Sequence, residues 1–466
     1  MKLIKLGLSK FFLLLNTSLF DKIIMVLSMS KIVNKISLVT IIILIGCLPV
    51  FFFLNHILGY ASDHWYNILL WVTVPILLFT YLYKIFKDKV KINKYDIFIY
   101  VFFFFLMLST RFSCHIKVST LGYPDRFEGL LSFMSYCLIF LNIKVLHNKD
   151  DYKKIIKVIF GIGIFQFIYS LFQVFFRFSF IKTFEISGVN YMAMGFIGNP
   201  NFLGSYCIML LGLALMLYLV KGERKYFGLS IIFFINLILA QSTGPFFAFI
   251  ILFIFMIVFM KIKGIIDWKK IGFVCASFIL TFIIVSNGVE LYCKKVFNDK
   301  IVSSYTIKGD ILNTLNLFGV SKGNNEENIT IEDYGSGRIT IWKRSLKIVP
   351  KYFWLGSGLD TFGYVFPQKS GIFYDKAHNE YLQMLITTGI FTLLSYLIIL
   401  FSLFIDGVKS NNKLIWVLMM AFIGYALQAF LNISVIFVAP TFYIIMGMMA
   451  GLISQEKVKG KLKKVA

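Results

Sequence analysis

The stretch Tyr334–Gly389 contains the residue types that could carry out chemistry. It combines arginine, histidine, carboxylates and glycines, and it has no apolar run of membrane length before Tyr381. Elsewhere the chain mostly alternates apolar runs with short basic segments. If the protein is an enzyme, we therefore expect much of its chemistry in this stretch.

His378 is the main candidate for proton transfer, with a purely structural histidine as the alternative. It lies in Asp375–Tyr381 (DKAHNEY), directly before an apolar run. If Asp375 caps a helix, His378 occupies the third helical position. The positive helix terminus would keep His378 neutral, so that it can accept a proton near neutral pH, and would attract a phosphate. The polar neighbours Asn379 and Glu380 favour a site here.

Arg338 begins a predicted amphipathic helix. Its apolar residues recur on one stripe and its lysines on another face; these are Ile339, Trp342, Leu346 and Val349, and Lys343, Lys347 and Lys351. Such a helix is typical of one lying on a membrane, with lysines that are solvated or meet anionic headgroups. Arg338 follows a Ser-Gly pair and can turn away from the stripe. The later Gly-Ser-Gly sequence at 356–358 is a weak phosphate signal, because no strand precedes it.

Two further polar clusters lie before predicted membrane helices. In the first, Arg126 is either an interfacial anchor or an anion-binding arginine held by the adjacent carboxylate of Glu128. In the second, Pro200 suits the first position of a helix and Asn199 can cap it. Capping does not account for Asn201, which lies beside small residues that permit close packing. We therefore include both asparagines among the candidate binding residues.

The composition predicts a membrane protein. The chain has 466 residues and is 58% hydrophobic, whereas a soluble protein averages about 45–50%. Its repeated apolar runs match the thickness of a bilayer, in which the backbone must be helical. The net charge of +24 does not indicate nucleic-acid binding, because most Lys and Arg outside one long loop fall in the predicted inner loops.

We predict an all-α polytopic membrane protein with about twelve spanning helices. The predicted spans are 36–54, 65–83, 96–110, 129–146, 155–175, 201–220, 226–240, 245–262, 271–287, 382–405, 414–432 and 434–453. The positive-inside rule places both termini in the cytoplasm, with the candidate site on the extracytoplasmic face of the cytoplasmic membrane.

The same pattern divides the chain into five parts. The first is a cytoplasmic or interfacial segment, 1–35, and the second is a set of nine spans, 36–287. A long extracytoplasmic loop with an interfacial helix follows at 288–381. Three more spans, 382–454, precede a basic cytoplasmic tail, 455–466.

Four motifs together resemble the O-antigen ligase and polymerase superfamily of bacterial membrane glycosyltransferases. All four are predicted on one face of the membrane, and the resemblance covers about 100–450. The motifs are RFEGLL at 126–131, GNPNFLG at 198–204, GSGRITIWKRSLKIVPKYFWLGSGLDTF at 335–362 and DKAHNEYLQMLITTGIF at 375–391.

The resemblance implies a GT-C-like helical fold and a glycan donor linked to undecaprenyl diphosphate. It implies transfer to a glycan, lipid or protein acceptor without a metal or other cofactor, among membrane lipids. Arg338 and His378 match the family's important arginine and histidine, so we expect them to stabilise the diphosphate and to orient or deprotonate the acceptor. The family often carries an arginine where this chain has Thr243. Either Arg126 replaces it, or the substrate differs from that of the family.

Three functions remain open at this point. We favour an O-antigen ligase-like enzyme, and a polymerase of lipid-linked repeat units differs only in its acceptor. A polysaccharide transporter or flippase is a more distant alternative. It predicts charges near the membrane midplane, each costing about 2.5–3.5 kcal/mol or more, and the predicted spans contain few. The binding residues expected beside Arg338 and His378 are Arg126, Glu128, Asn199, Asn201, Trp342, Asn379 and Glu380.

Overall fold

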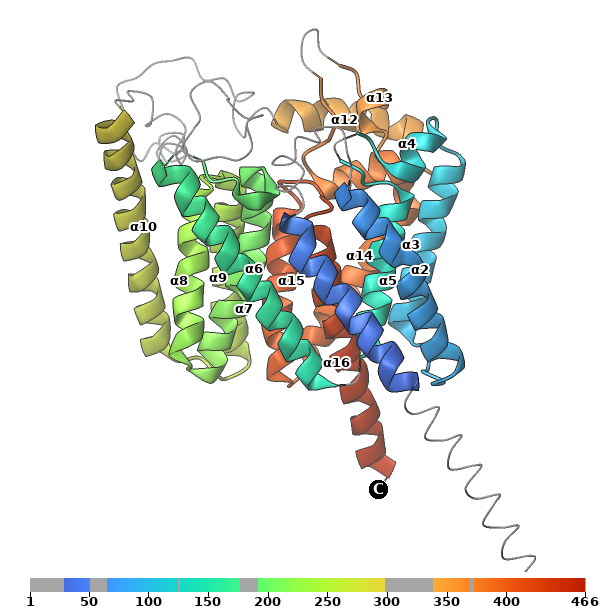
Figure 1. The fold of residues 1–466 in the computed structure, drawn as a ribbon, viewed down its shortest axis with the longest axis horizontal. Coiled ribbons are helices and arrows are strands. Elements are labelled where there is room, and N and C mark those ends of the chain that lie inside the picture. The colour runs from blue at the N-terminus through green and yellow to red at the C-terminus, as the bar shows by residue number, and fades with distance from the viewer. Residues whose placement is uncertain are drawn as a thin grey trace, which may run out of the picture.

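The structure is a computed structural model that describes residues 29–50, 65–124, 126–146, 148–176, 192–297, 338–368 and 373–465. Over these residues it consists of helices and their connections (Figure 1). The segments 1–28 and 298–337, which contain most of the predicted N-terminal segment and the first half of the predicted long loop, lie outside the described residues.

The principal helices follow the apolar runs of the sequence. In chain order they are Met29–Val50, α2 (Trp65–Phe86), α3 (Lys94–Arg111), α4 (Ile116–Leu121), α5 (Leu130–Lys144), α6 (Lys149–Phe176), α7 (Pro200–Lys221), α8 (Arg224–Leu239), α9 (Thr243–Ile262), α10 (Trp268–Phe297), α12 (Arg338–Tyr352), α13 (Phe362–Val365), α14 (Glu380–Lys409), α15 (Lys413–Gln428) and α16 (Ala439–Val465).

The all-α prediction is confirmed over the described residues, and their long apolar helices are consistent with a polytopic membrane protein. Within the described residues, seven helices are long and apolar enough to cross a bilayer: Met29–Val50, α2, α6, α7, α9, α10 and α14. Each of the twelve predicted ranges overlaps a helix of the described residues. The number of helices that span the membrane remains a prediction. The helix predicted at 271–287 continues to Phe297, so the connection after it begins later than the predicted residue 288.

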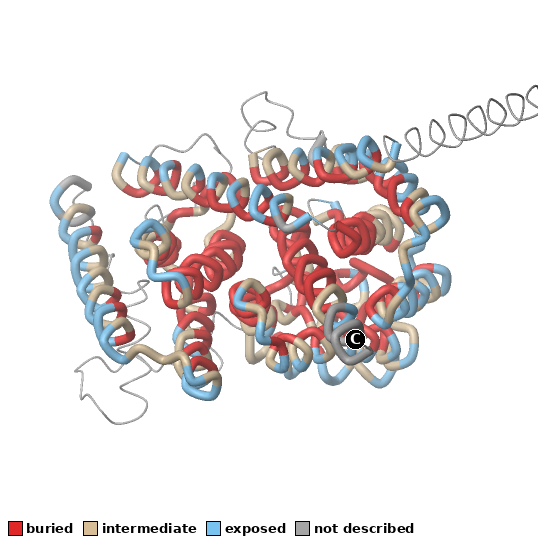
Figure 2. Tube along the Cα trace, turned by 90° about the horizontal axis from the view of Figure 1, so that it is seen from below, coloured by how far each residue is buried: buried red, intermediate tan, exposed pale blue. Residues whose placement is uncertain are grey.

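Helix α7 lies at the centre of the bundle, and nearly all of its side chains are buried. It packs against α8, α9 and α15, while α5 packs against α2 and α16. Gly212 permits one of these close approaches, because a Cβ there would lie 2.7 Å from the backbone nitrogen of Ala421 on α15. Buried residues line the interior of the bundle and exposed ones its outside (Figure 2). Small residues at helix contacts are expected where lipid surrounds the helices.

A cap of short helices and loops covers one end of the bundle (Figure 1). We define it as residues 112–124, 126–129, 338–368 and 373–379. It contains α4, α12 and α13. Its own small hydrophobic cluster joins Ile341 of α12 to Phe362, Phe366 and Ile386. The cap is thus fastened to the start of α14 by packing, and it supplies most of the candidate site.

The buried face of α12 differs from the predicted apolar stripe. Ile341 and Ser345 are buried, whereas Leu346 of the predicted stripe is 60% exposed. The helix packs onto the cap cluster through Ile341, so the side facing the protein is rotated from the one that periodicity selected. Lys343 and Lys347 are exposed, as predicted.

Helix α14 is broken at Gly389, and the glycine-rich turn of the cap fills the break. Gly389 has φ +81°, and Ile390 donates its N–H to the carbonyl of Phe353 at 2.8 Å. The amides of Ser357 and Gly358 donate to the carbonyls of Ile386 and Thr387, at 3.0 and 2.7 Å. These amides therefore satisfy helix carbonyls, and the Gly-Ser-Gly sequence is not a phosphate cradle.

We predict that Gly389→Ala destabilises the protein. A Cβ at Gly389 would lie 2.2 Å from the carbonyl oxygen of Trp354, and φ is positive there. Strain of this kind costs about 1–3 kcal/mol before any clash. The melting temperature in detergent should fall by several degrees, while the control Gly161→Ala, whose Cβ would meet nothing within 4 Å, should melt like the wild type. Equal melting temperatures for both variants would contradict this view of the break.

Candidate active site

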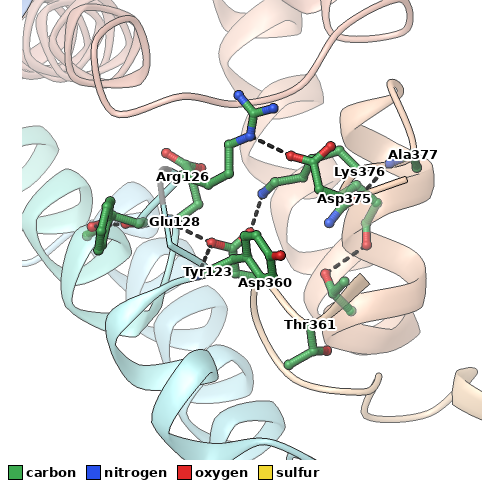
Figure 3. Close-up of polar contacts among 12 residues, drawn as sticks. Tyr123, Arg126, Glu128, Asp360, Thr361, Asp375, Lys376 and Ala377 are labelled. Atoms are coloured by element: carbon green, nitrogen blue, oxygen red, sulfur yellow. Dashed lines mark hydrogen bonds and ion pairs between the residues drawn. The ribbon is translucent and has the colours of Figure 1, made fainter. Parts of the chain in front are cut away.

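Arg126 is held by Asp375 and not by its neighbour Glu128. Its Nε donates to Asp375 Oδ2 at 2.6 Å, an ion pair between two parts of the cap (Figure 3). The predicted pairing of Arg126 with Glu128 is wrong, because Glu128 turns inward and accepts the hydroxyl of Tyr136 at 2.6 Å. Although burial alone raises the pKa of Asp375, the charge of Arg126 holds it below its ordinary value.

Asp360 joins the two parts of the cap that carry this ion pair. Its carboxylate accepts the backbone N–H groups of Tyr123 and Glu128, at 2.6 and 3.1 Å. It also pairs with Lys376, and both side chains are almost fully buried (Figure 3). Asp360 thereby fixes the segment that carries Arg126 against the segment that carries Asp375.

We expect Asp360→Asn to lower the stability of the cap. Removing one partner of a buried ion pair costs about 3–5 kcal/mol, because the other charge stays buried without compensation. The melting temperature should fall clearly. The matched control, Asp150→Asn, breaks an ion pair whose side chains are both 67% exposed, and it should leave the melting temperature unchanged. A drop that is no larger for Asp360→Asn than for the control would contradict the role of Asp360.

Arg338 is oriented by Asn201, at the start of α7. Arg338 Nη2 lies 3.4 Å from Asn201 Oδ1, which also accepts the hydroxyl of Ser242 at 2.6 Å. The amide of Asn432 donates to the carbonyl of Asn201 at 3.0 Å. Burial lowers the pKa of the Arg338 guanidinium, which still stays protonated at physiological pH. Asn201 thus has a role beyond the helix cap, because it connects α7, α9 and the loop before α16 to Arg338.

His378 lies just outside α14 and not within its first turn. The helix begins at Glu380, and its N-cap is Asn379, whose side chain accepts the N–H of Leu382 at 3.0 Å. The prediction that Asp375 caps this helix is wrong, because Asp375 pairs with Arg126. His378 has φ +49°, a conformation that is strained in most non-glycine residues and is common at functional sites.

A closed ring of contacts connects the segment Asp375–His378 to Arg126, Trp342 and Arg338. Arg126 pairs with Asp375, and two residues later the carbonyl of Ala377 accepts Trp342 Nε1–H at 3.0 Å. One turn before Trp342, Arg338 reaches Asn201. The ring closes through Phe202, next to Asn201, because the guanidinium carbon of Arg126 lies 5.9 Å from the centroid of its ring. The structure therefore brings together five predicted residues: Arg126, Asn201, Arg338, Trp342 and His378.

The electrostatics of the ring keep His378 neutral. The pKa of His378 is lowered to about 4, mainly by burial and also by the positive charges of Arg338 and Arg126, against the opposing charge of Asp375. The imidazole is therefore neutral near pH 7, as predicted, but the main causes are burial and the two arginines and not a helix terminus. Two cations and an available base at one place can stabilise a departing phosphate and accept a proton.

Glu128 and Glu380 lie behind the ring, in a cavity of about 30 Å³ that has room for one or two water molecules. Asp360 and Lys376 share this cavity. Glu380 accepts the hydroxyl groups of Tyr396 and Tyr425, each at 2.9 Å. Burial raises the pKa of Glu128 and the charge of Lys376 opposes this shift. The hydrogen bonds of both glutamates go to the protein, which suits positioning better than direct contact with a substrate.

The remaining predicted residues are helix caps. Asn199 accepts the N–H of Asn201 at 2.9 Å at the start of α7, with Pro200 in the first turn, as predicted. Sequence reasoning missed Asp360, Lys376, Ser242 and Asn432. Asp360 and Lys376 lie inside polar motifs already selected, whereas Ser242 and Asn432 gave no signal beyond a turn. Among the described residues, no group of three or more His, Cys, Asp or Glu is arranged to hold a metal ion.

Comparison with known proteins finds a family model that matches part of the chain. No curated protein matches the chain. A family model described as O-antigen ligase matches residues 228–397, from the start of α8 into α14. The matched segment includes Arg338 and His378, while Arg126 and Asn201 lie before it. Members of this family are glycosyltransferase-like enzymes, either ligases or polymerases. The match covers part of the chain and supports its resemblance to the O-antigen ligase and polymerase superfamily.

Proposed function

We propose that this protein transfers a glycan from an undecaprenyl-diphosphate carrier to an acceptor, as an O-antigen ligase-like enzyme. The observation that carries the proposal is the ring in which Arg126 and Arg338 flank a neutral His378. The family match suggests the class of substrate, a lipid-linked glycan in a membrane. The acceptor is a glycan, a lipid or a protein.

The proposed reaction breaks the bond between the anomeric carbon and the diphosphate oxygen. The acceptor hydroxyl attacks the anomeric carbon, and its proton passes to the imidazole of His378. The electron pair of the broken bond stays on the diphosphate, where Arg338 and Arg126 stabilise the charge. Because the leaving group is a diphosphate, the reaction needs no nucleotide sugar, and we propose that it is independent of metal.

The remaining site residues are assigned by their contacts. Asn201 and Trp342 hold Arg338 and the backbone before His378 in place. Glu128 and Glu380 support the cap from behind. We propose that Arg126 takes the place of the family arginine that is absent at Thr243, because it pairs with Asp375, three residues before His378.

We place the site on the extracytoplasmic face of the cytoplasmic membrane, with both termini in the cytoplasm. The distribution of Lys and Arg supports this orientation. At this level the lipid of the donor stays in the bilayer while its diphosphate meets the cap. The proposed division of the chain into membrane parts and one long loop is the one given by the hydropathy pattern.

The positions of the buried charges favour an enzyme over a transporter. Buried charged side chains in the described residues lie in the cap or near helix ends; they are Lys84, Asp96, Glu128, Lys144, Asp360, Lys376 and Glu380. A transporter is expected to place charges near the membrane midplane, at broken helices. The break in α14 at Gly389 is filled by the cap loop instead.

Deletion of the gene in its own host tests the function and separates the alternatives. For a ligase we expect loss of the finished surface glycan and accumulation of a polymer on its lipid carrier. Loss of a polymerase would leave single lipid-linked repeat units. In both cases the accumulated donor should be open to an impermeant oxidant such as periodate added to spheroplasts. A donor protected from that reagent would indicate a flippase and overturn the proposal.

A further inference from the structure

Four aromatic rings form a continuous surface on the cap, and the proposed chemistry does not use them. The centroid of the His115 ring lies 4.3 Å from that of Tyr364. The Tyr364 ring meets Tyr123 edge-on at 5.8 Å, and Tyr123 stacks on Phe373 at 6.0 Å. We call these four residues the aromatic platform. They come from two parts of the chain, 115–123 and 364–373, that are far apart in the sequence, so folding assembles the platform.

The platform is more exposed than expected for a group of aromatic side chains. Tyr364 is 49% and Phe373 is 56% exposed, and His115 is also exposed. The cap has a hydrophobic cluster of its own around Phe362 and Phe366, and the platform residues are not part of it. Contiguous exposed aromatic surface on a protein commonly marks a binding site.

The platform is rigidly mounted beside the candidate active site. The N–H of Tyr123 donates to Asp360 at 2.6 Å, and its carbonyl accepts the N–H of Arg126 at 3.0 Å. Phe373 precedes Asp375 by two residues. The Arg126–Asp375 ion pair therefore joins the two chain segments that carry the ends of the platform (Figure 3). A ligand that reaches the active-site ring can extend onto these rings.

The chemistry of the platform suits a sugar better than a lipid tail. A sugar ring presents C–H groups on its faces and hydroxyl groups around its rim. Aromatic faces are electron-rich and attract C–H groups, while tyrosine hydroxyls and a histidine nitrogen can bond to sugar hydroxyls. Exposed residues along the bundle that suit lipid are aliphatic and phenylalanine side chains, such as Val72, Phe79 and Ile254.

We propose that the aromatic platform is a sugar-binding subsite for the glycan chain, next to the phosphate-binding ring. This inference rests on the proposed function and deepens it, because it assigns the surface that holds sugars beyond the reacting one. Donor and acceptor glycans share the same chemistry, and the measurement below distinguishes them.

The test uses the full-length protein in nanodiscs. The donor is the lipid-linked glycan extracted from the gene-deletion strain, and the acceptor is the envelope fraction of the same strain. Initial rates are measured while each substrate is varied in turn. Tyr364→Ala and Phe373→Ala should each raise the KM of one substrate about tenfold and leave kcat within about twofold of the wild type. The substrate whose KM rises is the one that lies on the platform.

Two variants complete the design. Tyr364→Phe keeps the stacking face and should stay close to the wild type. Phe86→Ala removes an exposed phenylalanine at the end of α2, away from the platform, and should leave both KM values unchanged. An unchanged KM for both substrates in Tyr364→Ala and Phe373→Ala, with normal transfer, overturns the platform alone. Reduced protein yield with unchanged KM indicates a contact with lipid and also overturns it. A wild-type protein without transfer overturns the platform together with the proposed function.

Discussion

Arg338→Ala lowers kcat for glycan transfer by about 10²–10³-fold, the effect of removing one donor that stabilises the charge formed in the transition state. Arg338 is half-buried and held by Asn201, so water screens its charge less than it screens a charge at the surface. Arg338→Lys should recover only part of the rate, because an ammonium group lacks the planar fork of donors. Rates are measured with lipid-linked donor at saturation.

The matched control is Lys343→Ala on the same helix. Lys343 is exposed, and its removal subtracts one positive charge without touching the ring. We expect its kcat to match that of the wild type. If Arg338→Ala and Lys343→Ala lose activity equally, the effect is a general one of charge on α12, and the assignment of Arg338 to the diphosphate is wrong.

His378→Ala and His378→Gln should each lower kcat by about 10²–10⁴-fold, the usual contribution of a positioned general base. Glutamine keeps the approximate size and hydrogen bonding of the side chain and cannot accept the proton, so it separates base catalysis from packing. Tyr374→Phe, four residues earlier in the same segment, is the control and should remain active. Substantial activity in His378→Gln would exclude a base role and leave only an orienting one.

The pH profile gives an independent test of His378. A base must be deprotonated, and burial together with Arg338 lowers the pKa of His378 from 6.5 to about 4. The value of kcat/KM should therefore hold between pH 6.5 and 4, where an ordinary histidine would already be protonated, and fall as the pH drops through about 4. Arg338→Ala removes a positive neighbour, so the pKa of His378 should rise and the acid limb of the residual activity should move to higher pH. An acid limb near pH 6.5 in the wild type would contradict the buried setting of His378.

The helices could be predicted from the sequence because lipid imposes a simple rule on it. Every backbone polar group in the bilayer must be satisfied internally, so apolar length alone located the long helices of the bundle. The N-cap of α7, Asn199, and its first proline, Pro200, followed from local chemistry. The break in α14 could not be predicted from local chemistry. It depends on Phe353, Ser357 and Gly358, which come from another part of the chain.

The members of the site could be selected from the sequence, but most of its contacts could not. Arg126 and Glu128 are close in sequence and were paired for that reason, whereas folding brings Asp375 to Arg126 and sends Glu128 into the interior. Because Asp375 pairs with Arg126, it does not cap α14. Asn379 is the N-cap instead, and His378 therefore lies outside the helix. On α12, periodicity identified an amphipathic helix, but the position of the cap cluster decided which side faces inward. In each case a long-range partner outweighed a local preference.

Reconstitution in liposomes is the most direct test of the central claim. Purified full-length protein is given the extracted lipid-linked glycan and the acceptor fraction, without nucleotide sugar and with a chelator present. Covalent product and released undecaprenyl diphosphate are quantified together. We predict that the wild type forms both in equal amounts and that His378→Gln and Arg338→Ala form neither at a comparable rate. Movement of the glycan across the membrane without a new covalent bond, or equal product from all three proteins, would contradict the account.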